Sequence, residues 1–292
     1  MTIIELLLKI NNKLKNASLQ NTNKDAAMIV SKALNSTKEY LIINQDNSVK
    51  FSEIRQCIKM VKMRINHYSI SKIIGYKEFW GHEIMVNKNT LDPRPDSETI
   101  VDALIKHWPN KNKSLTILDL GTGTGCLAIA VAKEYKRSKG FALDINHKSL
   151  MLARQNLKKH NLLNRFKPLK TSWNSYASIT KKKFDVIISN PPYIKSRAIN
   201  NLANEVKLGE PLIALNGGCN GLHSILSIFK ILKIIMKENG VFICEIGFMQ
   251  EKELVLLYKK YGLTAKRHHH DLSGKIRCIT FTLTKPNQIN QC

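Results

Sequence analysis

The sequence lacks the features that mark membrane-spanning and disulfide-stabilised secreted proteins. Its most apolar stretch, residues 225–236, is interrupted by Lys230 and Lys233 and is too short to span a bilayer. The apolar start carries Glu5 and no basic leader, so we expect an amphipathic helix there and not a signal peptide. The six cysteines are scattered without a Cys-x-x-Cys pair, which argues against a zinc site and favours reduced thiols in a cytoplasm.

Acidic residues are scarce relative to basic ones. The chain has 22 Asp and Glu against 46 Lys and Arg, a formal net charge of +24. Such a charge favours attraction to nucleic acid or to a ribonucleoprotein. The lysines are spread over the whole of a chain rich in Lys, Asn and Ile, so a general compositional bias explains the charge equally well. The charge therefore identifies no substrate, and direct nucleic-acid binding stays open.

The first 96 residues predict two structural segments. Apolar residues recur at helical spacing through residues 1–74, which indicates a small helical bundle. Residues 79–86 have β character and are followed by the turn signal Asn87-Lys88-Asn89. We therefore expect a β-hairpin linker over residues 75–96.

Residues 97–292 predict an α/β domain. A helix should begin near Ser97, whose hydroxyl is expected to cap it. Strands then alternate with helices, which predicts a mainly parallel, Rossmann-like sheet with helices on both faces and an antiparallel hairpin at its end. The expected strands are 116–120, 140–144, 184–189, 241–246, 264–269 and 276–283, and the expected later helices are 127–136, 147–160 and 221–237.

A glycine-rich loop connects the first of these strands to a helix. Its residues are Gly121, Thr122, Gly123, Thr124 and Gly125, with Asp119 just before them and Asp144 at the end of the next strand. Glycines let the backbone approach a ligand closely, and a carboxylate at the second strand can accept two ribose hydroxyls.

Two nucleoside ligands compete for this loop. Dinucleotide-binding enzymes favour the spacing G-x-G-x-x-G, with a helix start facing a pyrophosphate. Here the spacing is G-x-G-x-G, and Asp119 would repel a pyrophosphate but suits the ammonium group of S-adenosylmethionine. The loop therefore predicts S-adenosylmethionine binding, with a dinucleotide oxidoreductase as the weaker alternative.

A second loop, Asn190-Pro191-Pro192-Tyr193, follows a strand that is buried by pattern. Its prolines fix φ and offer carbonyl groups without N–H groups, so the loop is stiff and rich in acceptors. The Asn190 side-chain oxygen and the Pro191 carbonyl could each accept one hydrogen of a substrate NH2 group, and Tyr193 could stack on its planar group. We therefore predict transfer of a methyl group to an amide or amino nitrogen.

These motifs together resemble the HemK or PrmC family, the glutamine-N5 methyltransferases of peptide-chain release factors. Asn-Pro-Pro-Tyr behind such a glycine loop is typical of methyltransferases that act on planar nitrogens. The more specific segments are Ile74-Gly75-Tyr76-Lys77-Glu78-Phe79-Trp80-Gly81, Arg94-Pro95-Asp96-Ser97-Glu98 and Asp271-Leu272-Ser273-Gly274-Lys275-Ile276-Arg277. The likeness covers nearly the whole chain, in the family's order.

The resemblance implies methylation of the glutamine in the Gly-Gly-Gln motif of release factors, which would dock on the helical domain. It implies that the glycine loop holds the amino-acid end of the donor, Asp144 its ribose and Trp173 its adenine, with Arg94 over the cofactor site. Ser172 departs from the family, in which many members carry Asp at that position. No metal site is expected, because His268-His269-His270 would alternate between the faces of a strand.

Two further functions remain as alternatives. The same loop suits N6-adenine methylation of DNA or RNA, although no additional target-recognition domain of useful size is present. A basic factor that binds ribosomes or nucleic acid without catalysis is the second alternative, and it predicts no affinity for S-adenosylmethionine.

Overall fold

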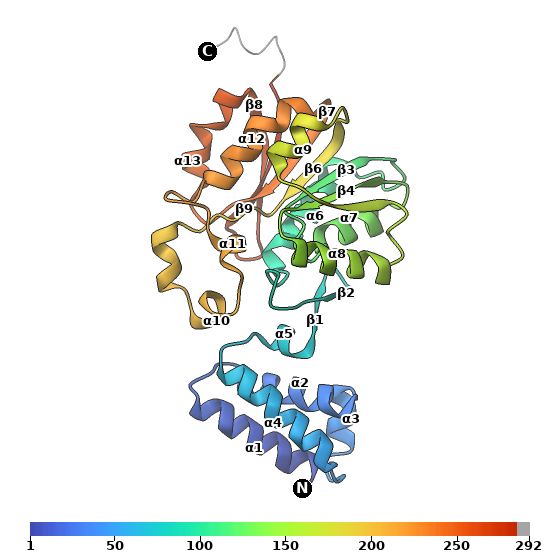
Figure 1. Ribbon diagram of the computed structural model, residues 1–292, viewed down its shortest axis with the longest axis vertical. Helices are drawn as coiled ribbons and strands as arrows, with labels where there is room; N and C mark the ends of the chain where they lie inside the picture. The colour runs from blue at the N-terminus through green and yellow to red at the C-terminus, as the bar shows by residue number, and fades with distance from the viewer. Residues whose placement is uncertain (285–292) are drawn as a thin grey trace. The chain divides into compact units, whose positions relative to one another are not determined.

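The computed structural model describes residues 1–284 and divides the chain into two compact units (Figure 1). The helical unit comprises residues 1–76, 86–88 and 202–210. The sheet unit comprises residues 77–85, 89–201 and the chain from residue 211 onward. Residues 202–210 thus belong to the helical unit although they lie within the sequence of the predicted α/β domain.

Five helices near the N-terminus build the helical unit, and a sixth short helix comes from its later segment. They are α1 Ile3–Asn16, α2 Thr22–Leu34, α3 Lys38–Ile43, α4 Phe51–Ile65, α5 Ile70–Ile74 and α10 Asn204–Lys207. Helix α1 begins with a capping box, in which the Thr2 hydroxyl accepts from the Glu5 N–H and the Glu5 carboxylate accepts from the Thr2 N–H. Its apolar face packs with α2 and α4 around a core that includes Leu14, Ile29 and Cys57.

Two buried cations, Arg64 and Lys72, form ion pairs within this small unit. Arg64 donates to Asp25 and to Glu205 at 2.6 Å each, and Lys72 donates to Glu210 at 2.5 Å. Two of these bonds join the first 76 residues to the segment 202–210, so the later segment is held to the helices by charge.

The sheet unit contains a two-stranded sheet, a seven-stranded sheet and the helices that cover it. The small sheet is formed by β1 Tyr76–Phe79 and β2 His82–Met85. The main strands are β3 Thr116–Leu120, β4 Lys139–Asp144, β5 Phe166–Lys170, β6 Phe184–Ser189, β7 Met236–Glu245, β8 Leu263–His270 and β9 Ile276–Leu283. The helices are α6 Glu98–His107, α7 Cys126–Glu134, α8 His147–Lys159, α9 Trp173–Ile179, α11 Leu212–Leu215, α12 His223–Ile235 and α13 Glu251–Val255, with 3-10 turns η1 Pro95–Ser97, η2 Ser196–Asn201 and η3 Tyr258–Tyr261.

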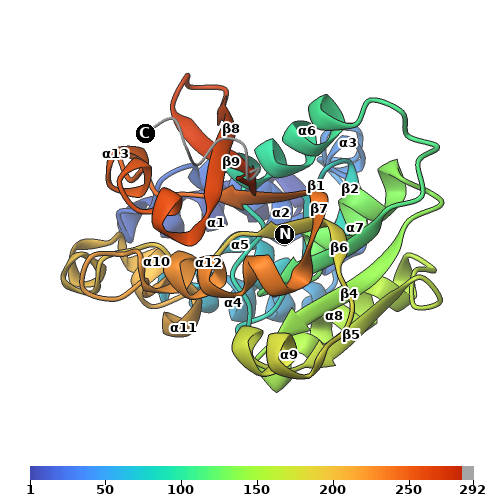
Figure 2. The same cartoon turned by 90° about the horizontal axis from the view of Figure 1, so that it is seen from above.

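The large sheet has the order β5-β4-β3-β6-β7-β9-β8 (Figure 2). Strands β3 to β7 pair in parallel, and β9 pairs antiparallel with both β7 and β8. The chain runs outward from β3 through β4 to β5, then returns to place β6 on the other side of β3. This reversal is a topological switch point, where open α/β sheets bind ligands beyond the carboxyl ends of the strands.

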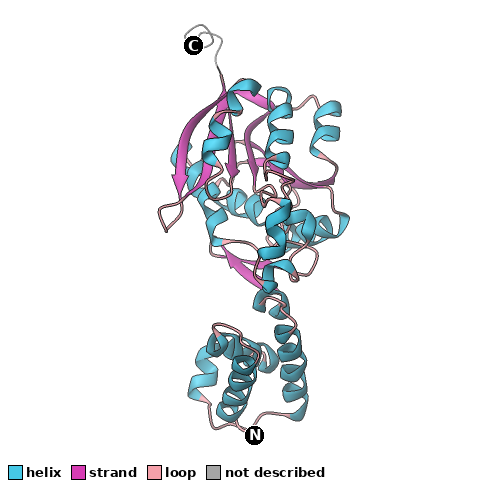
Figure 3. Cartoon of the chain, turned by 90° about the vertical axis from the view of Figure 1, so that its left-hand side faces the viewer, coloured by secondary structure: helices cyan, strands magenta, loops and turns pink. Residues whose placement is uncertain are grey.

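Helices cover both faces of the sheet, as the prediction of a Rossmann-like α/β fold requires (Figure 3). Alternate side chains of the strands enter two separate cores. Ile117 and Val186 face a core shared with α6, α7 and α8, whereas Leu118 and Ile187 face one shared with α9 and α12. The fold class and the antiparallel hairpin at the sheet edge are confirmed.

The structure contains several elements that the sequence pattern did not predict, among them the short helices α10, α11 and α13. Strand β5 and helix α9 were not expected, because Pro168 and three polar residues at 170–172 mask their pattern. The prediction that Ser97 caps helix α6 is wrong. Ser97 precedes α6 in a helical conformation, with φ −69° and ψ −17°, and makes no capping hydrogen bond.

In residues 1–284, no helix is both long enough and apolar enough to cross a membrane.

Candidate active site

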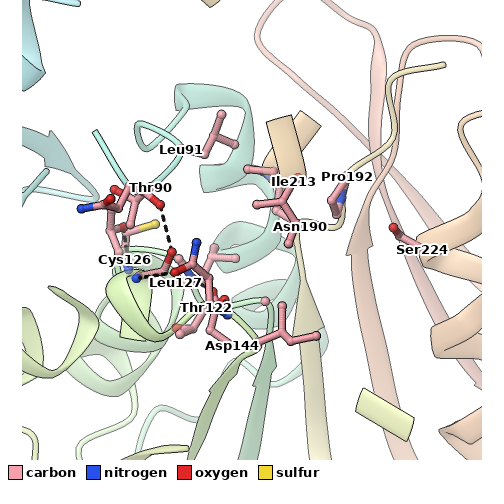
Figure 4. Close-up of a pocket in the computed structure, with 18 of the residues that line it drawn as sticks. Thr90, Leu91, Thr122, Cys126, Leu127, Asp144, Asn190, Pro192, Ile213 and Ser224 are labelled. Carbon is pink, nitrogen blue, oxygen red and sulfur yellow. Dashed lines mark hydrogen bonds between the residues drawn. The ribbon is translucent and has the colours of Figure 1, made fainter. Parts of the chain in front are cut away.

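A cavity of about 330 Å³ lies within the sheet unit, at the carboxyl ends of β5, β4, β3 and β6. Its walls come from residues 121–124 of the glycine loop, Asp144, the segment 171–174 and Asn190 on successive strands, and from Thr90, Arg94 and Ile213 on the connecting segments. Gly125, the last residue of the glycine loop, is not among the lining residues. Figure 4 shows Thr122 and Asp144 on the strand side, with Asn190 and Pro192 beyond them. The volume falls in the range of small-molecule sites.

The glycine loop turns sharply between β3 and α7. Gly121, Gly123 and Gly125 have φ of +76°, +57° and +83°, values that side chains rarely allow. The N–H groups of Gly121 and Thr122 donate to the Leu143 carbonyl, which fixes the loop against β4. A Cβ at Gly123 would meet no atom within 4 Å, so the loop leaves open space for a ligand there.

Asp144 lies at the end of β4 beneath this loop. Its Oδ2 accepts from the Gly123 N–H at 2.9 Å and its Oδ1 accepts from the Asn146 N–H at 2.8 Å. Burial raises the pKa of Asp144, an effect that the backbone N–H groups partly offset. Each carboxylate oxygen has two lone pairs and uses one of them for these backbone bonds. Each oxygen can therefore accept one more hydrogen bond, so that together they can accept from two hydroxyl groups of a ligand.

Asp119 occupies a different environment from the one expected of a ligand contact. It is completely buried and is not among the residues that line the cavity. Its Oδ2 accepts from the Thr122 hydroxyl at 2.6 Å, and burial raises its pKa to about 7. In this structure Asp119 therefore supports the glycine loop from below.

Trp173 lies in the cavity wall at the first turn of α9. Its ring would be 3.6 Å from a Cβ at Gly121, so it sits beside the glycine loop. Ser172, also in the wall, caps α9 by accepting from the Ser175 N–H at 3.1 Å. Serine and aspartate are both favourable N-caps, so the departure from the family pattern keeps the cap that orients Trp173. Arg94 also lines the cavity.

The Asn190 side chain enters the cavity from the end of β6. Its Nδ2 donates to the Ser97 hydroxyl at 2.8 Å. The Ser97 hydroxyl in turn donates to Glu245 at 2.5 Å, and the Tyr193 hydroxyl donates to the other oxygen of Glu245 at 3.1 Å. Ser97 and Glu245 are 3% and 1% exposed, so this hydrogen-bonded network lies inside the protein.

The structure does not place the whole Asn-Pro-Pro-Tyr loop in the cavity wall. Asn190 and Pro192 line the cavity, whereas Pro191 is buried and, like Tyr193, is not among the lining residues. Burial and the negative charge of Glu245 raise the pKa of the Tyr193 phenol. Tyr193 is therefore a neutral donor to Glu245 at neutral pH.

Sequence reasoning missed Ser97 and Glu245 as members of the site. Glu245 is the last residue of β7, which lies next to β6 with both carboxyl ends at one edge of the sheet. The available signal was a carboxylate directly after the apolar run of residues 241–244, at the carboxyl end of a strand in the parallel part of the sheet. Ser97 had been read as a helix cap, which concealed its distant partners.

The order of the strands and the cavity at the switch point of the sheet define the structural class of the protein. The chain has the α/β architecture of class I methyltransferases, and two solved structures share it. A structure described as "SAM Dependent Methyltransferase from Agrobacterium tumefaciens" has a TM-score of 0.50 at 12% identity, covering 72% of this chain and 70% of that one. The hMettl16 catalytic domain in complex with the MAT2A 3'UTR hairpin 6 has a TM-score of 0.54 at 14% identity, covering 76% and 84%.

Sequence comparison identifies the family. The profile of the PrmC N-terminal domain matches residues 5–75, and that of the methyltransferase small domain matches residues 94–210. A release factor glutamine methyltransferase of Caulobacter vibrioides is 31% identical over 96% of this chain and 96% of its own length. A homologue from Clostridium botulinum with the same name is 32% identical over 96% and 98%. The chain belongs to the release factor glutamine methyltransferase family, as its motifs predicted.

Some relatives are considerably longer. A bifunctional methyltransferase of Rickettsia felis is 32% identical over 96% of this chain, which spans only 58% of that protein. The homology to these longer proteins therefore concerns little more than half of their length.

Proposed function

We propose that this protein methylates the side-chain amide nitrogen of the glutamine in the Gly-Gly-Gln motif of peptide-chain release factors, with S-adenosylmethionine as donor. The observation that carries the proposal is that Asn190 and Asp144 line one cavity, from strands on either side of β3. One wall thus offers a site for a nucleoside, and the neighbouring wall offers an amide oxygen. Membership of the family supports the same activity.

The residues present fit S-adenosylmethionine. The spare acceptor positions of Asp144 suit the two ribose hydroxyls, and the open space at Gly123 admits a ligand close to the backbone. Trp173 offers an aromatic face for adenine beside Gly121, and Arg94 covers the site. In this proposal the segment from Gly121 to Gly125 holds the amino-acid end, with Asp119 supporting the loop. When bound, the donor supplies an electrophilic methyl group.

Asn190 is the proposed anchor of the substrate amide. Because its NH2 group faces Ser97, its side-chain oxygen remains to accept from a substrate N–H. The Pro191 carbonyl, which follows Asn190 directly but lies outside the cavity wall in this structure, is the proposed second acceptor, and Pro192 and Tyr193 keep the loop rigid. An amide nitrogen is a poor nucleophile, so holding both N–H bonds and aligning the nitrogen is most of the catalytic task. The net change replaces one N–H hydrogen with a methyl group and releases a proton.

The helical unit is the proposed docking site for the release factor. The domain assignment of the proposal is residues 1–74 for docking, 75–96 for the linker and 97–292 for methyl transfer. Because the substrate is a translation factor, the proposed place of action is the cytoplasm.

The test is mass spectrometry of the Gly-Gly-Gln peptide from a release factor incubated with enzyme and S-adenosylmethionine. We expect a mass increase of one methyl group on glutamine. Asn190→Ala should abolish it, whereas the exposed asparagine control Asn112→Ala should not. Parallel incubations with DNA and RNA address N6-adenine methylation. The proposal is wrong if wild-type enzyme modifies only nucleic acid, or if Asn190→Ala keeps full activity.

A further inference from the structure

Only one end of the Asn190 carbamoyl group can face the cavity. Its two ends, the oxygen and the NH2 group, are almost equal in size. Steric fit therefore does not decide whether its oxygen or its NH2 group faces the cavity. Hydrogen bonding must decide, because the oxygen accepts and the NH2 group donates. The partner that decides in this structure is the Ser97 hydroxyl, 2.8 Å from Asn190 Nδ2.

The Ser97 hydroxyl takes its direction from Glu245. Above its pKa of about 7, Glu245 is ionised and has only acceptors, so both hydroxyls that contact it, those of Ser97 and Tyr193, must donate. Ser97 has a single hydroxyl hydrogen, and this hydrogen is used at Glu245. Its oxygen can then only accept, so Asn190 must turn its NH2 group toward Ser97.

We propose that Ser97 and Glu245 are positioning residues that orient the Asn190 amide with its oxygen toward the substrate, an inference that rests on the proposed function. The opposite orientation would present an NH2 group to the substrate NH2 group and leave both without an acceptor. Tyr193 takes part by holding the second oxygen of Glu245. The network thus supplies the directional information that the shape of the loop lacks.

A direct role of Glu245 as a base toward the substrate is disfavoured by its position. It is 1% exposed, it is not among the residues that line the cavity, and each of its oxygens already accepts from a hydroxyl. Ser97 does line the cavity, but its one hydrogen is committed to Glu245. Both residues therefore act through Asn190.

Two substitutions test the network at different points. Ser97→Ala removes the acceptor for Asn190. Glu245→Gln keeps size but adds an NH2 donor, so Ser97 can accept from Gln and donate to the Asn190 oxygen. Both variants should reduce kcat for release factor about 10- to 100-fold, the loss expected for a misplaced contact. The Kd for S-adenosylmethionine, measured by calorimetry, should stay within about twofold, since neither change touches Asp144 or the glycine loop.

Two further variants separate orientation from structure. Ser97→Thr keeps the hydroxyl and should retain kcat within about threefold. Ser138→Ala removes another fully buried hydroxyl of the same unit, which bonds Leu115 and Lys113 outside the site, and should leave kcat unchanged. Thermal unfolding of every variant shows whether it is folded at the assay temperature.

The outcomes are distinct. Wild-type activity in folded Ser97→Ala overturns the inference, as does a loss in Ser97→Thr as large as that in Ser97→Ala. Failure of wild-type enzyme to methylate any release factor overturns the proposed function instead. Should Glu245→Gln fail to fold, the two Ser97 variants still decide the question.

Discussion

Asp25 and Glu210, two buried carboxylates of the helical unit, face cations, whereas Asp119, Asp144 and Glu245 of the sheet unit face hydroxyl and N–H groups. Asp25 is paired with Arg64, and Glu210 with Lys72. Within residues 1–284, Asp119, Asp144 and Glu245 form no ion pair, and all three have raised pKa values because they are buried. A buried charge that is paired with an opposite charge holds two segments together. A buried charge without such a partner costs stability and is retained where binding or chemistry requires it.

The largest expected effect is on stability, in the helical unit. Arg64→Met leaves Asp25 buried without its cation, because Arg64 supplies the only cation paired with Asp25 among the described ion pairs. We expect a loss of about 3–5 kcal/mol in the free energy of unfolding, measured by urea denaturation. The affinity for S-adenosylmethionine should not change.

The matched control replaces Arg64 together with its buried partner Asp25 and leaves the partly exposed Glu205 to be solvated. Arg64→Met combined with Asp25→Leu removes the buried charge together with its cation and should recover most of the stability. A single variant as stable as wild type would show that the pair does not stabilise the helical unit.

The second effect is on binding, at Asp144. Asp144→Asn loses one acceptor and presents an NH2 group to a backbone N–H that now donates to the carboxylate. Charged hydrogen bonds contribute about 1.5–3 kcal/mol each, so the Kd for S-adenosylmethionine should rise about 100-fold. Asp102→Asn, at an exposed ion pair with Lys106, is the control and should leave the Kd unchanged. If both variants have the same Kd, Asp144 does not bind the ligand. The proposed difference between carboxylates with and without a cation partner is then wrong.

The sequence predicted local patterns well because strands β3 and β6 have uninterrupted apolar runs followed by distinctive loops. Their bounds were predicted to the residue. Strand β5 was missed because its pattern includes Pro168, a residue that usually breaks strands but is tolerated here at the sheet edge.

Contacts between residues distant in sequence were not predictable in the same way. Nothing near Ser97 indicates that it bonds to Glu245, 148 positions later. Nothing near residues 202–210 indicates that Glu205 and Glu210 pair with Arg64 and Lys72 in the helical unit. Such contacts depend on the strand order and on the path of the chain, which a periodicity does not contain.

A third prediction uses pH to separate the two kinds of carboxylate. Burial raises the pKa of Glu245 from 4.5 to about 7. The folded protein therefore holds this proton more tightly than the unfolded chain does, and Glu245 costs stability increasingly as pH rises between these values. Glu245→Gln should gain stability relative to wild type between pH 5 and pH 8, by on the order of 2 kcal/mol. Denaturation at several pH values measures the difference.

Asp185 is the control of opposite sign. Burial acts to raise its pKa, but hydrogen bonds from Thr116 and Lys237 outweigh burial and lower it. Its contribution to stability is present above the ordinary pKa of 3.8 and is lost as pH falls below it. Asp185→Asn should thus be less stable than wild type at pH 7 and similar to it near pH 3. The same pH trend in both variants would contradict the assignment of the Glu245 pKa.

The smallest effect sharpens the comparison by adding a carboxylate at the cavity wall. Ser172→Asp keeps the cap of α9, since aspartate accepts from the Ser175 N–H as serine does. Like Asp144, the new carboxylate beside Trp173 would have no cation partner and would be able to accept a hydrogen bond from the ligand. This one added hydrogen bond should lower the Kd for S-adenosylmethionine about fivefold. Ser172→Ala loses the cap and should be about 1 kcal/mol less stable. A higher Kd for Ser172→Asp, with an unchanged free energy of unfolding, would mean that this wall faces a negative or apolar part of the ligand and that adenine lies elsewhere.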